Sequence, residues 1–228
     1  MSRFLVALSA REGQEKVLCA RIVEELQFLR SASGGPPALA RGMVRLPEDP
    51  FGAQYPTLRP FDAVIECETP SRPAAFETWL EGLAGRLEDL IHADLSGIVS
   101  GETRLISGSV GGPVRFLYFM RRKAGWTHES FSRYWGEEHV KFGMQMPGIL
   151  GYEQLHAAPD SSSAAAGRAG FGVLAIDGVA ILHLKSVEVF LAESSTSSVG
   201  AQAIEDERNF VDGRNSVGMS MNVVGGLD

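Results

Sequence analysis

The sequence is poor in cysteine and in long charged or apolar runs. Of its 228 residues only Cys19 and Cys67 are cysteines. They form neither a CxxC pair nor a disulfide framework, which favours a reducing cytoplasm. The formal net charge is −7 and the basic run 121–123 is short, so nucleic-acid binding is disfavoured. The apolar stretch 4–8 is too short for the core of a signal peptide, and no membrane class is suggested.

Several catalytic signatures are absent as well. The chain contains no HExxH, Walker, GxSxG or GxGxxG motif. Hydride transfer on a Rossmann site, nucleoside triphosphate use and serine hydrolysis therefore lack their usual sequence support. Glu138 and His139 are neighbours in a predicted helix, where successive side chains point about 100° apart. The pair is a poor joint metal site, and no metal is predicted.

What the sequence does contain is an internal repeat. Arg3–Leu8 aligns with Arg115–Met120, and Gly13 then falls on Gly125 without a gap. Each glycine is followed by a segment with helical spacing. The hydrophobic fraction of 44% and the charged fraction of 21% are ordinary for a folded globular chain. The length allows two domains of roughly 110 residues each.

Each repeat has the predicted order strand, helix, strand, strand, helix, strand. In the first unit the clearest elements after the opening strand are a helix at 14–30, a strand at 63–67, a helix at 74–92 and a strand at 103–106. In the second they are a helix at 127–146, strands at 150–155 and 179–184, a broken helix at 187–210 and a strand at 219–224. This βαββαβ order is ferredoxin-like, and its sheet needs cover on the face without helices.

We therefore predict an α+β protein in which two ferredoxin-like βαββαβ repeats cover each other. The junction SGSVGGP is glycine-rich and ends in a proline, so the predicted division is a first half at 1–107, a linker at 108–113 and a second half at 114–228. Two other segments, 31–42 and 157–172, are interpreted as exposed connectors rather than ordered lids. The alanines of the second could instead form one helical turn.

The second half resembles the EthD family of the dimeric α/β-barrel superfamily. The features shared with that family are an apolar strand ending in arginine, a turn glycine, Phe131, the pair Tyr134–Trp135, His139 and Pro147–Gly148, with weaker similarity at 177–180 and 206–212. The resemblance covers most of 113–228. It implies a dimeric α/β-barrel closed within one chain, whereas single-repeat relatives pair two chains. A homodimer through outer surfaces stays open.

The first half departs from this pattern where the histidine stands. The gapless alignment puts Gln27 opposite His139 and Val23 opposite Trp135. If the family's histidine is functional, the chain has one active pocket and one degenerate half. The resemblance implies a fold and a pocket rather than one reaction. Relatives are linked to breakdown of ethers and other small organic compounds or act on polyketide aromatics, and the wider superfamily includes cofactor-free monooxygenases, cyclases and haem proteins.

His139 is the main catalytic candidate. On a regular helix Phe131, Trp135, Phe142 and Met146 form one apolar stripe, with His139 at its edge. An imidazole with a pKa near 6.5 could act as a general acid or base there. The aromatic residues would exclude water and stack a flat substrate. The alternative is a histidine at the edge of the core, satisfied by one hydrogen bond.

Further polar residues lie on the predicted strands. Tyr118, Tyr152 and His183 could each donate a hydrogen bond to a developing oxyanion or bind a substrate carbonyl. We take Tyr152 and His183 as additional catalytic candidates, and Tyr118 as a substrate-binding residue together with the four stripe residues. Each also suits a packing or surface role. The acidic run 205–207 is interpreted as a solvated helix face.

The preferred hypothesis is a cofactor-independent enzyme that acts on a small aromatic or other apolar oxygenated metabolite. Because no redox cofactor motif is present, a lyase step such as dehydration or decarboxylation is favoured, with a cofactor-free monooxygenase as second choice. The alternative from another class is a non-catalytic protein that binds a hydrophobic ligand or haem. In the haem case His139 would be an axial ligand.

Overall fold

The computed structural model describes residues 2–31, 37–51, 59–69 and 74–227. The first half contains β1 (Ser2–Leu8), α1 (Glu15–Ser31), β2 (Leu39–Arg45), β3 (Ala63–Thr69), α2 (Ala74–Leu80), α3 (Leu83–Arg86) and β4 (Gly97–Gly108). The second half contains β5 (Val114–Met120), α4 (His128–Tyr134), the π-helix η2 (Trp135–His139), α5 (Val140–Gln145), β6 (Gly151–Ala157), α6 (Pro159–Ala169), β7 (Gly178–Leu184), α7 (Val187–Ser194), α8 (Val199–Phe210) and β8 (Val217–Leu227).

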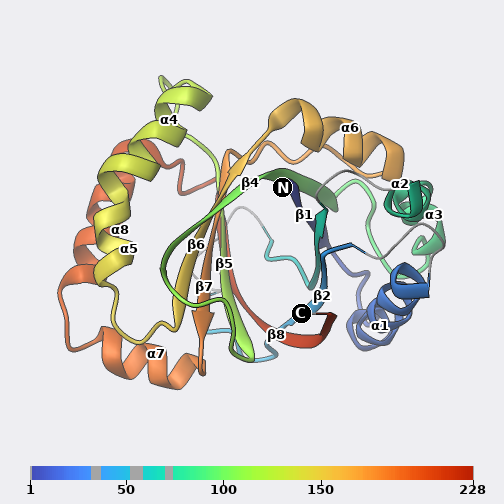
Figure 1. Cartoon of the computed structure of the whole chain (residues 1–228), viewed down its shortest axis with the longest axis horizontal. Helices are drawn as coiled ribbons and strands as arrows, with labels where there is room; N and C mark the ends of the chain where they lie inside the picture. The colour runs from blue at the N-terminus through green and yellow to red at the C-terminus, as the bar shows by residue number, and fades with distance from the viewer. Residues whose placement is uncertain (1, 32–36, 52–58, 70–73, 228) are drawn as a thin grey trace.

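The strands close into one barrel. Their order is β1-β3-β2-β8-β5-β7-β6-β4, with β4 returning to β1. Each half supplies four adjacent antiparallel strands, β4-β1-β3-β2 and β8-β5-β7-β6, which is the ferredoxin-like order. The two sheets join where β2 pairs with β8 and where β4 pairs with β6. The predicted α+β barrel of two repeats is therefore confirmed (Figure 1).

Both faces of each sheet are covered, which explains the long apolar runs in the strands. In β5, Leu117 and Phe119 point into the barrel, where they join an apolar cluster drawn from strands of both halves. Tyr118 and Met120 point outward to a separate cluster that includes Phe131 and Trp135 of the helical layer. This alternation follows from the two-residue period of a strand.

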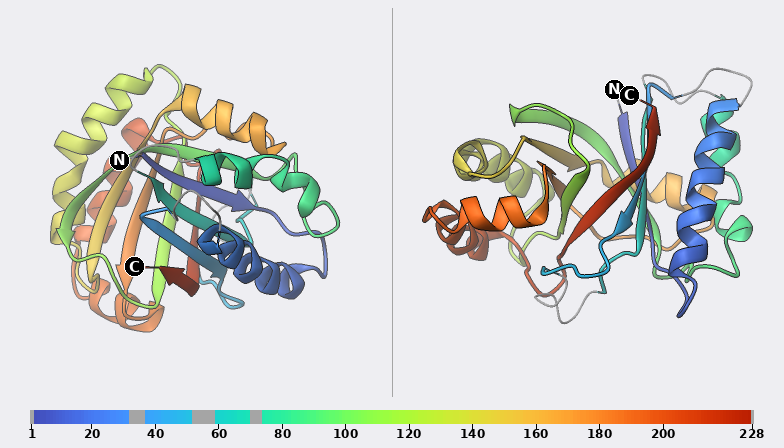
Figure 2. Two further views of the ribbon diagram at one scale, coloured as in Figure 1. Left: turned by 45° about the vertical axis from the view of Figure 1, so that its right-hand side comes forward. Right: turned by 90° about the horizontal axis from the view of Figure 1, so that it is seen from below.

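The helices form two outer layers. Helices α1, α2 and α3 lie on one side of the barrel, and α4, α5, α7 and α8 lie on the opposite side (Figures 1 and 2). Helix α6 belongs to the second half by sequence, but Ala165, Ala166 and Ala169 are buried in the core of the first half. It thereby links the two layers.

The interpretation of 157–172 as an exposed connector is wrong. The segment contains the eleven-residue helix α6, with Pro159 at its start and Gly170 in the left-handed conformation at its end (φ 82°). Both residues occupy positions that they favour at helix ends. The low hydrophobicity of serine and alanine concealed the helix, because its small buried face becomes apparent only beside the first-half core.

Other boundaries also differ from the predictions. Strand β2 begins at Leu39, inside the predicted 31–42 connector, of which 32–36 lie outside the described residues. The predicted helix at 74–92 is shorter and divides into α2 and α3 at Gly82, whose φ of 66° interrupts the helix. Strand β4 starts at Gly97, six residues before the predicted strand, because it must pair with both β1 and β6.

Within the described residues, no helix is long and apolar enough to cross a membrane.

Candidate functional site

His139 lies at the end of a π turn rather than within a regular helix. Thr127 caps α4, accepting a hydrogen bond from the Ser130 backbone N–H in a capping box. The single helix predicted for 127–146 is then interrupted by η2, after which α5 continues to Gln145. π turns are rare in proteins, and many of those that occur lie at functional sites. The interruption decides which neighbours His139 meets.

The neighbour that matters most is Asp206 on α8. The Nδ1 atom of His139 lies 2.8 Å from Asp206 Oδ2, and Tyr134 donates a hydrogen bond to the other carboxylate oxygen at 2.8 Å. The side chain of His139 is only 8% exposed. A carboxylate on Nδ1 fixes the tautomer that carries its proton there, so Nε2 is left with the lone pair.

The protonation states follow from burial and from these contacts. Burial lowers the pKa of His139, and the hydrogen bond and charge of Asp206 only partly offset it. Burial opposes ionisation of Asp206, but the hydrogen bonds from His139 and Tyr134 outweigh it and lower the pKa of Asp206. At neutral pH the pair is therefore a neutral imidazole held by a carboxylate, which is the state a general base requires.

A second carboxyl group faces the free nitrogen of His139. Glu207 Oε1 lies 3.8 Å from Nε2, and the Glu207 side chain is 24% exposed. Burial, reinforced by the charge of Asp206, raises the pKa of Glu207 to about 7. Near neutral pH this carboxyl is thus poised to hold or release a proton next to the imidazole.

The interpretation of 205–207 as a solvated face holds only for Glu205, whose side chain is 72% exposed and pairs with Arg208. Asp206 and Glu207 turn towards η2 and α5, because α5 and α8 pack side by side. One sequence signal was available, since 206–212 is among the segments that carry the EthD resemblance. Charge alone could not separate these carboxylates from their exposed neighbour.

Aromatic rings surround the imidazole of His139. The rings of Phe142 and Phe210 lie 5.3 and 5.1 Å from it, centroid to centroid. Of the predicted substrate-binding residues, Phe142 is thus the one in ring contact with His139. Tyr118, Phe131 and Trp135 lie together in the cluster between sheet and helices, which also contains Phe210. Met146 packs with a different cluster around Leu184 and Phe190.

Tyr152 lies on the same side of the sheet as His139, beneath the helix. Its hydroxyl accepts a hydrogen bond from Gln154 Nε2 at 3.0 Å, so its own proton remains available for donation. Burial raises the pKa of Tyr152. The phenol is therefore protonated at neutral pH and can act only as a donor or acceptor of hydrogen bonds, not as a base.

His183 does not lie with His139, which corrects their grouping as one set of catalytic candidates. It points into the barrel, where its Nε2 atom is 2.7 Å from Glu153 Oε2. Glu153 in turn accepts a hydrogen bond from Arg3 Nη1 at 2.9 Å. Strand alternation places His183 and Glu153 on the inner face of the sheet, whereas His139 is on the outer side. This cluster joins β1 of one half to β6 and β7 of the other.

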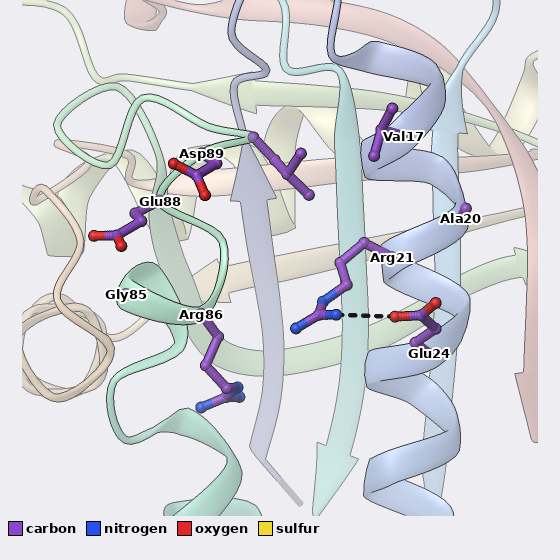
Figure 3. A pocket seen from close by; sticks show the side chains of 9 residues that line it. Val17, Ala20, Arg21, Glu24, Gly85, Arg86, Glu88 and Asp89 are labelled. Carbon is purple, nitrogen blue, oxygen red and sulfur yellow. Dashed lines mark hydrogen bonds and ion pairs between the residues drawn. The ribbon is translucent and has the colours of Figure 1, made fainter.

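Two surface hollows lie away from His139. One of about 360 Å³ lies between α1 and the segment after α3, and its Arg21 is paired with Glu24 (Figure 3). Another of about 340 Å³ lies at the barrel rim by Arg3 and Glu68. Both are built largely from charged residues. Neither provides an imidazole or an aromatic lining.

The fold and the site define the class of protein. The chain is an α/β-barrel of the dimeric type, closed by two ferredoxin-like halves of one polypeptide, with a histidine and carboxylate pair in the helical layer of one half. Residues 123–214, which lie within the second half of the chain, match the EthD domain. The sequence has no significant match among curated proteins.

Solved structures with the same fold cover nearly the whole chain. An anthrone oxidase-like protein has a TM-score of 0.61 at 11% identity, over 99% of this chain and 92% of its own. A proposed monooxygenase from Lactobacillus acidophilus has a TM-score of 0.51 at 11% identity, over 100% and 99%. A mutant chlorite dismutase from Candidatus Nitrospira defluvii has a TM-score of 0.54 at 10% identity, over 97% and 91%. At these identities the likeness concerns the fold alone.

Proposed function

We propose that the protein is an enzyme in which His139 acts as a general base on a small, apolar, oxygenated aromatic substrate. The observation that carries the proposal is the buried pair of His139 and Asp206, 2.8 Å apart, in which Nε2 keeps its lone pair. Flanking Phe142 and Phe210 favour a flat apolar substrate over a charged one.

The proposed chemistry begins with removal of a proton from an acidic C–H or O–H group of the substrate. Nε2 accepts that proton, and Asp206 stabilises the resulting imidazolium. Glu207, with a pKa of about 7 and next to Nε2, can take the proton on or return it. The electron pair left on the substrate delocalises into its aromatic and carbonyl system.

The fate of that anion decides the reaction type. Expulsion of a leaving group gives the lyase reaction expected from the sequence, whereas reaction with dioxygen gives a cofactor-free oxygenation. The names of the structural neighbours, an anthrone oxidase-like protein and a monooxygenase, favour testing the second route alongside the first. The first step is shared by both.

The direct experiment is to incubate the purified protein with hydroxylated aromatic ketones and anthrones, with and without oxygen, and to follow products by mass spectrometry. Turnover that His139→Gln abolishes and His128→Gln leaves intact supports the proposal. His128 is a suitable control because it lies in the same helical layer but pairs with Asp177 instead. Full activity of the His139→Gln protein would disprove the role of His139.

Haem is the group that His139 would bind if the protein belonged to the haem-binding class. The imidazole has the free Nε2 and the Nδ1 carboxylate that suit an axial ligand. However, the Glu207 carboxyl stands 3.8 Å from Nε2, and the Phe142 and Phe210 rings flank the imidazole. These residues do not fit a porphyrin in this arrangement, and no step is derived through haem.

A non-catalytic carrier for a hydrophobic ligand is the remaining alternative. It is favoured by the aromatic character of the cluster around Phe131 and Trp135, since aromatic rings stack with flat apolar molecules. A carrier should retain the same affinity for an aromatic probe when His139 is replaced by glutamine, and it should release the probe chemically unchanged. Calorimetric titration followed by mass analysis of the recovered probe separates the two functions.

A further inference from the structure

The π turn changes the direction of every side chain that follows it. A π turn closes from residue i to i+5 and so contains one residue more than an α-helical turn. Because each residue of an α-helix advances about 100° around the axis, one extra residue rotates the following segment by about that angle. The turn spans Trp135–His139. It therefore sets which surface α5 and His139 present to α8.

Trp135 and His139 illustrate this change of direction. Residues i and i+4 share one face of a regular α-helix. Here the Trp135 ring lies on the sheet, 4.7 Å from the ring of His156 and directly over the backbone of Gly178. His139 faces α8 and Asp206 instead. The pairing of His139 with Asp206 thus depends on the wide turn.

One side chain of the sheet reaches into this turn. Gln154 of β6 is fully buried, and its Nε2 donates hydrogen bonds to the Trp135 carbonyl at 3.2 Å and to Tyr152 Oη at 3.0 Å. Its Oε1 lies 3.1 Å from His156 Nε2. The reverse orientation of the amide would set its oxygen against the Trp135 carbonyl, and two acceptors cannot bond. The hydrogen bond to the Trp135 carbonyl therefore fixes the orientation of the Gln154 amide group.

The orientation of Gln154 is secured from its other side. Because Oε1 only accepts, the hydrogen on His156 must be on Nε2, and Nδ1 then accepts from the hydroxyl of Ser132 at 2.6 Å. Burial, with the nearby charge of Arg104, lowers the pKa of His156 to about 4. The ring is thus neutral at physiological pH, as this arrangement requires. Ser132, His156 and Gln154 form one chain of hydrogen bonds ending at the π turn.

Close packing fits the helix to the same strand. A Cβ atom on Gly143 would lie 2.1 Å from the Tyr152 ring, and one on Gly136 would lie 3.3 Å from His156 Cε1. Glycine at these two places lets the helix backbone rest on the outward side chains of β6. The π turn therefore packs on a surface formed by the side chains of Tyr152, Gln154 and His156.

We propose that Gln154 is a positioning residue, which holds the π turn open through the Trp135 carbonyl and so keeps His139 against Asp206. The inference deepens the proposed function of His139, but it concerns geometry and can be tested without a substrate. In the absence of this hydrogen bond, the turn closes to an α-helical one and His139 rotates away from Asp206.

The test follows the imidazole of His139 by NMR in the full chain. The wild-type protein is expected to show a strongly downfield Nδ1 proton from the bond to Asp206, and this resonance should be lost in His139→Gln. Gln154→Leu, of similar size but without donors, should lose the same resonance and shift the His139 titration midpoint. Tyr152→Phe is the matched control, because it removes the other partner of Gln154 and leaves the Trp135 contact; it should keep the resonance.

Deletion of Gly136 provides a rescue that separates positioning from general damage. Removing one residue from the wide turn gives a regular helix with the flanking segments in their original directions. The deletion combined with Gln154→Leu should therefore recover the downfield proton. An unchanged His139 resonance in folded Gln154→Leu would overturn the proposal. The proposal would also be overturned if Gln154→Leu lost the resonance or its folding and the deletion of Gly136 did not restore it. Loss of the resonance without loss of turnover would instead refute the proposed function of His139 and leave the positioning role standing.

Discussion

The first helix of each half occupies the same place in the fold, but the two helices differ in regularity and in the side chains that they bury. Helix α1 is regular from Glu15 to Ser31 and buries leucine and isoleucine side chains. Its counterpart is interrupted by η2 and buries His139. Gln27, the residue opposite His139 in the gapless alignment, is exposed. The two halves share topology and differ in whether this helix buries an imidazole.

The π turn refines this comparison. If its extra residue is counted as an insertion, the position opposite His139 becomes Leu26, which is buried in the first-half core. The first half thus has a hydrophobic anchor where the second half has an imidazole. The polar residue buried on α1 is Glu25, which accepts a hydrogen bond from Trp79 Nε1 at 2.9 Å and pairs with Arg86. A repeated fold can therefore keep one half for stability while the other carries chemistry.

The largest expected effect comes from giving position 139 of the second half the residue that stands opposite it in the first half. His139→Gln should lower turnover by about 10²–10⁴-fold, the usual contribution of a general base. The reciprocal change, Gln27→His, should create no activity, because position 27 is exposed and has no buried carboxylate partner. Steady-state kinetics on a substrate found by product screening checks both. Activity gained by Gln27→His would contradict the asymmetry of the halves.

The hydrophobic anchor of the first half is tested by Leu26→Ala. We expect a loss of about 2–5 kcal/mol in the free energy of unfolding, from the lost burial and the cavity left behind. Denaturant melts followed by circular dichroism measure it. Leu191→Ala on α7 is the control, since Leu191 is 41% exposed and should cost far less. Equal losses for the two variants would show that Leu26 is not an anchor.

The link between the halves is tested by Glu153→Gln. This change should cost about 1.5–3 kcal/mol of stability, the range for a hydrogen bond to a charged group. Glu68→Gln is the matched control, because Glu68 also pairs with Arg3 but lies in the same half and is 20% exposed. Its cost should be smaller. A larger loss for Glu68→Gln would mean that the link between halves does not depend on Glu153.

The same carboxylate gives a dependence on pH. Burial opposes ionisation of Glu153, but the hydrogen bond from His183 and the charge of Arg3 outweigh it and lower its pKa. Its stabilisation is therefore full above the unfolded value of about 4.3 and is lost as the pH falls through the lower folded value. The stability difference between wild type and Glu153→Gln should accordingly shrink below about pH 4. Acid titration of denaturant midpoints measures it.

The smallest expected effect is a shift in a pH profile. Since burial lowers the pKa of His139, kcat/KM should rise with pH through a midpoint below about 6.5, the ordinary histidine value. Glu207 should add an inflection at about 7. Glu207→Gln is expected to remove the second inflection and keep the first. A profile unaffected by Glu207→Gln would exclude this carboxyl from the proton path.

Much of this arrangement could be predicted because the sequence repeats itself. Alignment of Arg3–Leu8 with Arg115–Met120, together with the strand and helix patterns, predicted the two repeats, and the EthD resemblance implied that they close into a barrel. Helix α6 could not be predicted in the same way, because an alanine-rich segment has no clear period and is buried only by the other half. His139 was identified by resemblance and helical spacing. Its partners Asp206 and Glu207 lie on a helix about seventy residues later and were hidden in an acidic run.

By itself the sequence determined the α+β class and the two βαββαβ repeats, because strand and helix periodicities are local properties of the chain. Together with the family resemblance it also predicted His139, rather than Gln27, as the candidate. Only the tertiary structure decided that His183 points into the barrel and that Asp206 meets His139. Both depend on distant segments coming together: His183 is paired with Glu153 across two strands, and His139 reaches Asp206 through a π turn that rests on Gln154. A shift of one residue in the helical register decides whether the imidazole of His139 pairs with the carboxylate of Asp206 or points elsewhere.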